Sequence, residues 1–159
     1  MAAIAGRLKG AYSIFAQGAS SLQSLFLLFV RLYWGWQFWQ TGWGKLHRLP
    51  QVVEFFASLG IPAPWLNAHF VAGLECFGGI LLAVGLGSRI LALMFTVDML
   101  MAYITADRAA LFSIFSNPGD FYAAAPYTFL VASLIILIFG PGRFALDYLI
   151  ERYWLQREV

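Results

Sequence analysis

The sequence predicts an all-α integral membrane protein, a four-helix bundle with an interfacial amphipathic helix at each end. Three observations support this fold class: 61% of the residues are hydrophobic, only 11% are charged, and the apolar residues gather in four long stretches. A chain of 159 residues with 10 Lys or Arg and 8 Asp or Glu cannot cover a water-exposed surface with charge. The formal charge of +2 is small and no basic run occurs, so we expect no nucleic-acid partner.

Four stretches approach the ~20 mostly apolar residues that a membrane-spanning helix needs. The fourth is short, and Pro126 near its start is tolerated because the first helical turn has no internal partner for the missing N–H. No internal repeat or linker is evident, so residues 1–159 are expected to form one domain. The expected spans are 21–43, 66–86, 89–106 and 124–140.

Both ends of the chain have the pattern of a helix lying at the membrane surface. Before the first span, apolar residues recur at helical spacing beside Arg7 and Lys9; they are Ile4, Leu8, Tyr12 and Phe15. After the GPG sequence at 140–142, apolar residues alternate with charges; they are Phe144, Leu146, Leu149, Ile150, Tyr153 and Trp154.

The basic residues of the loops predict the orientation. With cytoplasmic termini, six basic residues lie inside and three lie outside, in agreement with the positive-inside bias. The inner residues are Arg7, Lys9, Arg89, Arg143, Arg152 and Arg157; the outer ones are Lys45, Arg48 and Arg108. The two outer loops, 50–60 and 110–122, are themselves apolar and are expected to rest on the membrane surface or cover the mouth of the bundle.

Three ionisable residues fall in the middle of the expected spans. Arg31 is ten residues into the first span, and Glu75 and Asp98 are each nine residues into theirs. At 1.5 Å per residue each lies ~14–15 Å from its helix start, near the midplane of a ~30 Å hydrocarbon core. An isolated charge there costs at least ~2.5–3.5 kcal/mol, so we expect the three residues to face inward and form one cluster.

Helical geometry is compatible with this cluster. Advancing 100° per residue places Gly35, Phe38, Gly42 and Lys45 on the Arg31 side of the first span, and the tryptophans at 36, 39 and 43 on the other side. Small residues also surround Glu75, so another helix can approach it closely.

More than one role is open for these residues. The cluster could bind a ligand or only fix the pairing of the helices. Lys45 could attract a ligand from the outer side or only extend to the headgroups. Cys76, the one cysteine, excludes an internal disulfide and has the pattern of a small hydrophobe. His69 shares its stripe but lies ~10 Å away along the helix, so we expect no metal site.

Several segments together resemble the DoxX family of small four-helix bacterial membrane proteins. They are RLYWGWQFWQTGWGKL (31–46), GIPAP (60–64), GLECFGGILLAVGLGSRILAL (73–93), DMLMAYITA (98–106) and FGPGRFALDYLI (139–150). The resemblance implies that the family's arginine, glycines and lysine of the first span correspond to Arg31, Gly35, Gly42 and Lys45. The glutamate and glycine pair of the second span correspond to Glu75, Gly78 and Gly79, with the glycines in helix packing.

The resemblance also implies a function and a location. Relatives include subunits of a thiosulfate:quinone oxidoreductase, membrane partners of thiol and superoxide-detoxifying proteins, and assembly factors. One hypothesis is therefore a redox-linked membrane subunit in the bacterial inner membrane, at most a component of a quinone-linked oxidoreductase, that binds a quinone or a small sulfur compound near Arg31, Glu75 and Asp98. The other hypothesis is a noncatalytic scaffold or assembly subunit. Either predicts further protein subunits as partners in the bilayer and no covalently bound cofactor.

Overall fold

The computed structural model describes residues 2–154, with the side chains of residues 2–11, 14 and 21 left out. Every regular element in this part of the chain is helical. Arg157 and the side chains of Arg7 and Lys9, which contribute to the predicted orientation, lie outside the described atoms. The elements are α1 (Ala2–His47), α2 (Leu49–Ser58), α3 (Pro64–Gly73), η1 (Leu74–Gly78), α4 (Gly79–Val84), α5 (Ser88–Thr105), α6 (Arg108–Phe112), α7 (Pro118–Ala123), α8 (Pro126–Phe139) and α9 (Leu146–Tyr153).

Two helices in the described part of the chain are long and apolar enough to cross a membrane. One is the continuous helix Pro64–Val84, made of α3, the π-helical turn η1 and α4, and the other is α5. The first and last residues of both helices lie within two residues of those of the predicted spans 66–86 and 89–106. α8 is apolar but has 14 residues, ~21 Å, and the predicted span 21–43 forms part of α1. The structure therefore supports two spans directly, and the four-span arrangement stays a prediction.

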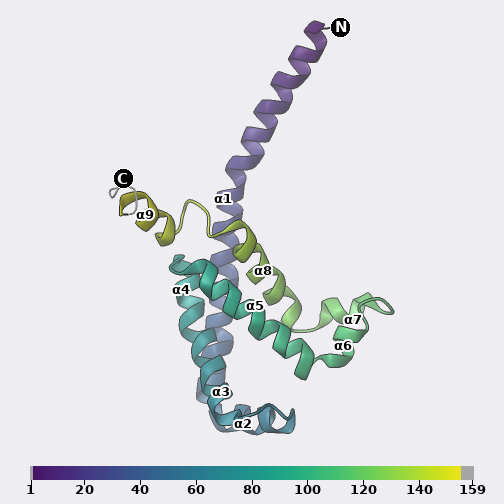
Figure 1. Cartoon of the computed structure of the whole chain (residues 1–159), viewed down its shortest axis with the longest axis vertical. Helices are drawn as coiled ribbons and strands as arrows, with labels where there is room; N and C mark the ends of the chain where they lie inside the picture. Colours follow the sequence, from purple (N-terminus) through teal and green to yellow (C-terminus); the bar gives the residue numbers. More distant parts are fainter. Residues whose placement is uncertain (1, 155–159) are drawn as a thin grey trace.

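α1 differs from the prediction at its start. It is one helix of 46 residues, and Figure 1 shows its N-terminal part projecting beyond the other helices. The predicted N-terminal interfacial helix is thus not a separate element. The first proline of the chain is Pro50, so nothing before it forces the helix to break.

α1 packs antiparallel against the helix Pro64–Val84. A Cβ on Gly35 would lie 2.7 Å from the carbonyl oxygen of Gly79, and one on Gly42 would clash with the backbone nitrogen of Cys76. The two helix backbones therefore approach each other as closely as glycine allows.

α5 and α8 form the second helix pair, which joins the first through Phe38 of α1. The fully buried Phe38 ring stacks on Phe95 of α5 with ring centroids 3.8 Å apart, and it meets Phe129 of α8 edge-on at 4.8 Å. At one end a tight turn containing Gly85 and Gly87 links α4 to α5, and from this turn the two helices diverge (Figure 1). We call this the turn end of the bundle, and the opposite end, where α2 lies, the cavity end.

Candidate functional site

A cavity of about 700 Å³ lies at the cavity end, between α2, the helix Pro64–Val84 and α5. This volume is in the range of small-molecule and cofactor sites. The wall is mostly apolar, with three charged residues and Asn67 among the polar exceptions. Its lining residues include Val52, Phe55, Phe56, Leu59, Phe70, Leu74, Leu93, Met94, Val97, Met99, Met101 and Ala102, together with Lys45, Glu75 and Asp98.

The three charged residues come from three different helices. Lys45 of α1 donates a hydrogen bond from Nζ to Oε1 of Glu75 on η1 at 2.6 Å. The Glu75 side chain is 3% exposed and that of Lys45 is 32% exposed, so the carboxylate is buried and the ammonium group reaches the surface. Asp98 of α5 lies close enough to interact electrostatically with both. We call Lys45, Glu75 and Asp98 the charged triad.

The triad has more acceptors than protein donors. Oε2 of Glu75 and Oδ2 of Asp98 are both covered by protein and have no hydrogen-bond partner in the described structure. With all three groups ionised the triad has one positive and two negative charges. Leaving a buried charged acceptor without a donor costs roughly 1–3 kcal/mol or more, so a partner such as a ligand, a proton, a water or an ion is needed to complete these groups.

The local backbone explains how Glu75 and Lys45 meet. Gly42 allows α1 to touch the backbone at Glu75 and Cys76, and Lys45 lies one helical turn further along the same face of α1. Glu75 and Cys76 belong to η1, the π-helical turn that interrupts the helix Pro64–Val84. Single π-helical turns inside α-helices occur frequently at functional sites.

α2 forms one wall of the cavity. Pro50 lies in its first turn, and the side chains of Val52, Phe55 and Phe56 face the cavity. The segment 50–60, predicted to rest on the membrane or cover the bundle mouth, thus covers part of the cavity.

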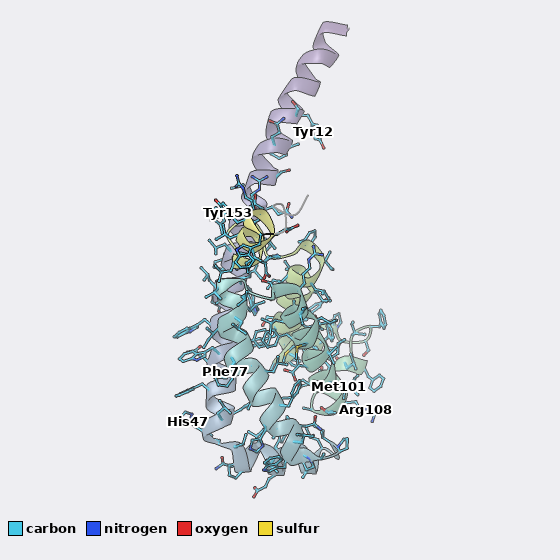
Figure 2. The ribbon with its side chains drawn as sticks, turned by 60° about the vertical axis from the view of Figure 1, so that its left-hand side comes forward. Tyr12, His47, Phe77, Met101, Arg108 and Tyr153 are labelled. Atoms are coloured by element: carbon cyan, nitrogen blue, oxygen red, sulfur yellow. The ribbon has the colours of Figure 1, made fainter. Side chains whose placement is uncertain are left out.

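The cavity also opens sideways, along α5. Leu93, Val97 and Met101 line it and are each about half exposed, and Phe70 on the opposite wall is similarly exposed. Figure 2 shows Met101 among the side chains on the outer surface of the helices. On this side the cavity is therefore bordered by exposed apolar side chains of α3 and α5.

Arg31 does not join the triad. It lies at the turn end, fully buried, where Nη2 donates to the carbonyl of Phe144 at 2.7 Å and Nη1 to that of Ala83 at 3.4 Å. Asp147 lies near enough to interact with its charge.

Asp147 connects the same region to α5. Its carboxylate accepts hydrogen bonds from the backbone N–H groups of Gly87 and Ser88 at 2.7 and 2.8 Å, and its own N–H donates to Gly85 at 2.9 Å. Arg31 and Asp147 therefore tie together α1, the α4–α5 turn, the segment before α9 and the first turn of α9. We call these two residues with their backbone partners the clasp.

The antiparallel pairing of the helices explains this separation. Gly42 of α1 lies opposite Glu75, whereas Arg31, eleven residues earlier, lies opposite the end of α4. Eleven residues are ~16 Å along a helix, beyond the reach of an arginine side chain to Glu75. The predicted common depth counted Arg31 from a first span beginning at residue 21. In the structure Arg31 instead lies beside Ala83, near the end of the helix Pro64–Val84.

The remaining candidates lie around these two sites. Gly78 and Gly79 are buried; Gly79 faces α1 and Gly78 faces the ring of Phe95. Cys76 is buried, and His69 makes its contacts one turn back, with Nδ1 2.7 Å from the carbonyl oxygen of Trp65 and its ring 4.1 Å from that indole. Among the described residues no group of three or more His, Cys, Asp or Glu side chains could hold a metal ion.

Sequence reasoning missed two parts of this arrangement: the Lys45–Glu75 ion pair and the clasp role of Asp147. The first had a readable signal. In an antiparallel helix pair, the residue numbers of two residues that face each other have a nearly constant sum along the pair. Packing Gly42 against the small-residue face around Glu75 therefore also brings Lys45 close to Glu75.

Comparisons with known proteins bear on the family to which the chain is similar. The family model described as DoxX matches residues 26–108, a range that includes the whole triad. A curated relative from Bacillus subtilis (strain 168), named "Putative oxidoreductase CatD", is 30% identical over 120 residues, which cover 76% of this chain and 83% of the relative. No solved structure gives a significant match.

Proposed function

Because the chain belongs to the DoxX family of membrane-associated proteins, we propose that it is a membrane component of a redox-linked complex that binds a quinone-type ligand in the cavity. The redox assignment is supported by the name of the curated relative, an oxidoreductase. The binding site is argued from this chain's own residues.

The observation that carries the proposal is the pairing of an apolar cavity with unsatisfied buried carboxylate oxygens. About 700 Å³ of space lies beside Glu75 and Asp98, each of which has an oxygen without a protein donor. A ligand with an apolar body and a polar, hydrogen-bonding ring fits both features. A quinone in its redox forms has this chemistry, and it dissolves in the bilayer to which the cavity opens.

The charge balance weighs against the other ligand class, a small sulfur anion. An anion would enter a site that already holds two acidic side chains, Glu75 and Asp98, against one ammonium group, that of Lys45. Like charges at close range in a poorly solvated site repel strongly. Arg31, which would have offset this charge, lies in the clasp instead.

The membrane arrangement that fits this role has four spans. In it α1 and α8 cross beside the two helices of spanning length, and both termini are cytoplasmic in the bacterial inner membrane. α9 then lies at the cytoplasmic surface, where its exposed apolar residues Leu149, Ile150 and Tyr153 meet the interface.

A cavity-filling substitution tests the proposal. Ala102 lines the cavity, whereas Ile104, two residues along α5, is half exposed and does not line it. Ala102→Phe should abolish retention of quinone in purified protein and its rebinding in nanodiscs, and the matched control Ile104→Phe should leave both unchanged. If the wild-type protein retains and binds no quinone, the redox-site proposal is wrong.

One observation favours a second function, that of a scaffold or assembly subunit. The N-terminal part of α1 projects beyond the bundle and exposes Tyr12 and Phe15, each 72% exposed (Figures 1 and 2). An aromatic helix face without a cover in this chain is suited to contact another subunit. If removal of residues 2–18 releases copurifying subunits while Ala102→Phe changes no redox activity of the complex, the scaffold function replaces the redox one.

A further inference from the structure

The charged triad defines which hydrogen-bonding groups its ligand must carry. This inference rests on the proposed quinone site and concerns the form of the ligand bound there. The ionisable residues that line the cavity are Lys45, Glu75 and Asp98, one each from α1, η1 and α5. The lining residues of α2 and α3 carry no ionisable group.

The triad lacks donors and has acceptors in excess. Among the described residues, the only protein donor bonded to either carboxyl group is Lys45 Nζ, on Oε1 of Glu75. Oε2 of Glu75 and Oδ2 of Asp98 have none, although both atoms are covered by protein. A ligand that hydrogen-bonds to these two oxygens must therefore carry its own N–H or O–H donors.

The two redox forms of a quinone differ in this property. The oxidised ring has two carbonyl oxygens, which only accept hydrogen bonds. It could accept from Lys45, whose ammonium group has three donors and uses one on Glu75. Bound in this way it would still leave Oε2 of Glu75 and Oδ2 of Asp98 without a donor.

The reduced ring has hydroxyl groups, which both donate and accept. One hydroxyl can accept from Lys45 while it donates to a carboxylate of Glu75 or Asp98. Hydrogen bonds with a charged partner are the stronger kind, so the reduced ring gains an interaction that the oxidised ring does not have.

From these contacts we infer that the cavity selects the hydroquinone form of its ligand, with the ring hydroxyls donating to Glu75 and Asp98. Selection follows from donor capacity, because the two forms have nearly the same shape and apolar area. The same reasoning disfavours ligands whose polar groups only accept.

The test compares three probes on the wild-type protein in nanodiscs under anaerobic conditions. The probes are a decyl-substituted benzoquinone, its hydroquinone, and the dimethyl ether of that hydroquinone, which keeps the ring and loses both donors. The hydroquinone should bind about tenfold or more tightly than either other probe, the factor expected for one hydrogen bond to a charged group.

Asp98→Asn gives the matching change in the protein. The side-chain amide supplies its own donor, so the affinity for hydroquinone should fall and the preference for hydroquinone over quinone should shrink to about threefold or less. Asp107→Asn, just beyond α5 and outside the cavity lining, should keep the wild-type preference. Melting temperatures and gel filtration show that each variant is folded.

The outcomes separate the two proposals. If none of the three probes binds to wild type, the quinone site itself is wrong. If the benzoquinone or the ether binds as tightly as the hydroquinone, the site stands and the donor selection is overturned.

Discussion

Replacing Arg31 by methionine tests the clasp quantitatively. Methionine keeps most of the apolar length of the side chain and removes its donors and charge. The variant loses the 2.7 Å hydrogen bond to Phe144 and the weaker 3.4 Å bond to Ala83, and it leaves the Phe144 carbonyl without this donor. One good charge-assisted hydrogen bond and one weak one amount to about 2–4 kcal/mol of unfolding free energy.

The assay is reversible unfolding in mixed micelles, followed by circular dichroism. Arg152→Met is the control, because Arg152 is exposed on α9 and its loss should change stability by no more than about 0.5 kcal/mol. If Arg31→Met is as harmless as the control, Arg31 is not a buried tie between these segments.

A double-mutant cycle locates the partner of Arg31. The clasp predicts that Arg31→Met couples to Asp147→Asn by about 0.5–3 kcal/mol and is additive with Glu75→Gln within about 0.5 kcal/mol. Strong coupling to Glu75 with additivity toward Asp147 would instead support the midplane cluster expected from the sequence, and would refute the placement of Arg31 at the turn end.

Three further changes test other parts of the structure. Gly42→Ala should lower the melting temperature strongly, because its Cβ would clash with the backbone of the facing helix, whereas Gly44→Ala has open space and should be neutral or stabilising; equal effects would contradict the close crossing. Lys45→Met should destabilise by about 1–3 kcal/mol because it leaves the carboxylate of Glu75 buried without its cation, and adding Glu75→Gln should recover most of the loss; no recovery in the double variant would argue against the ion pair. A reporter fused to the C-terminus should be cytoplasmic and one inserted at Ser116 should be on the outer side, and a periplasmic C-terminus would contradict the four-span arrangement.

The helix boundaries near the α4–α5 turn could be predicted because the local chemistry is decisive. Gly85 and Gly87 both have positive φ, at +79° and +63°, a conformation that other residues rarely adopt. Together with the apolar stretches on either side, they predict one helix ending and another beginning there. The helical wheel likewise predicted that Phe38 faces the protein and Trp36 and Trp43 face outward, and these are 0%, 55% and 50% exposed.

The relative depth of Arg31 and Glu75 could not be obtained in this way. Periodicity tells which face of a helix a residue occupies, but not how far one helix slides along its neighbour. That register depends on where Gly35 and Gly42 meet the facing backbone, a tertiary contact with no local signature. The clasp also pairs Arg31 with Phe144, more than a hundred residues away in sequence.

The most direct measurement for the central claim, that the cavity beside the charged triad binds a quinone-type ligand, is photoaffinity labelling with an azidoquinone followed by peptide mapping. The account predicts that labelled residues fall within 93–106 of α5 and within 52–62, the wall around α2, and that excess hydroquinone suppresses this labelling. Labelling at the turn end, around Gly85 or 140–147, or labelling that excess hydroquinone does not reduce, would contradict it.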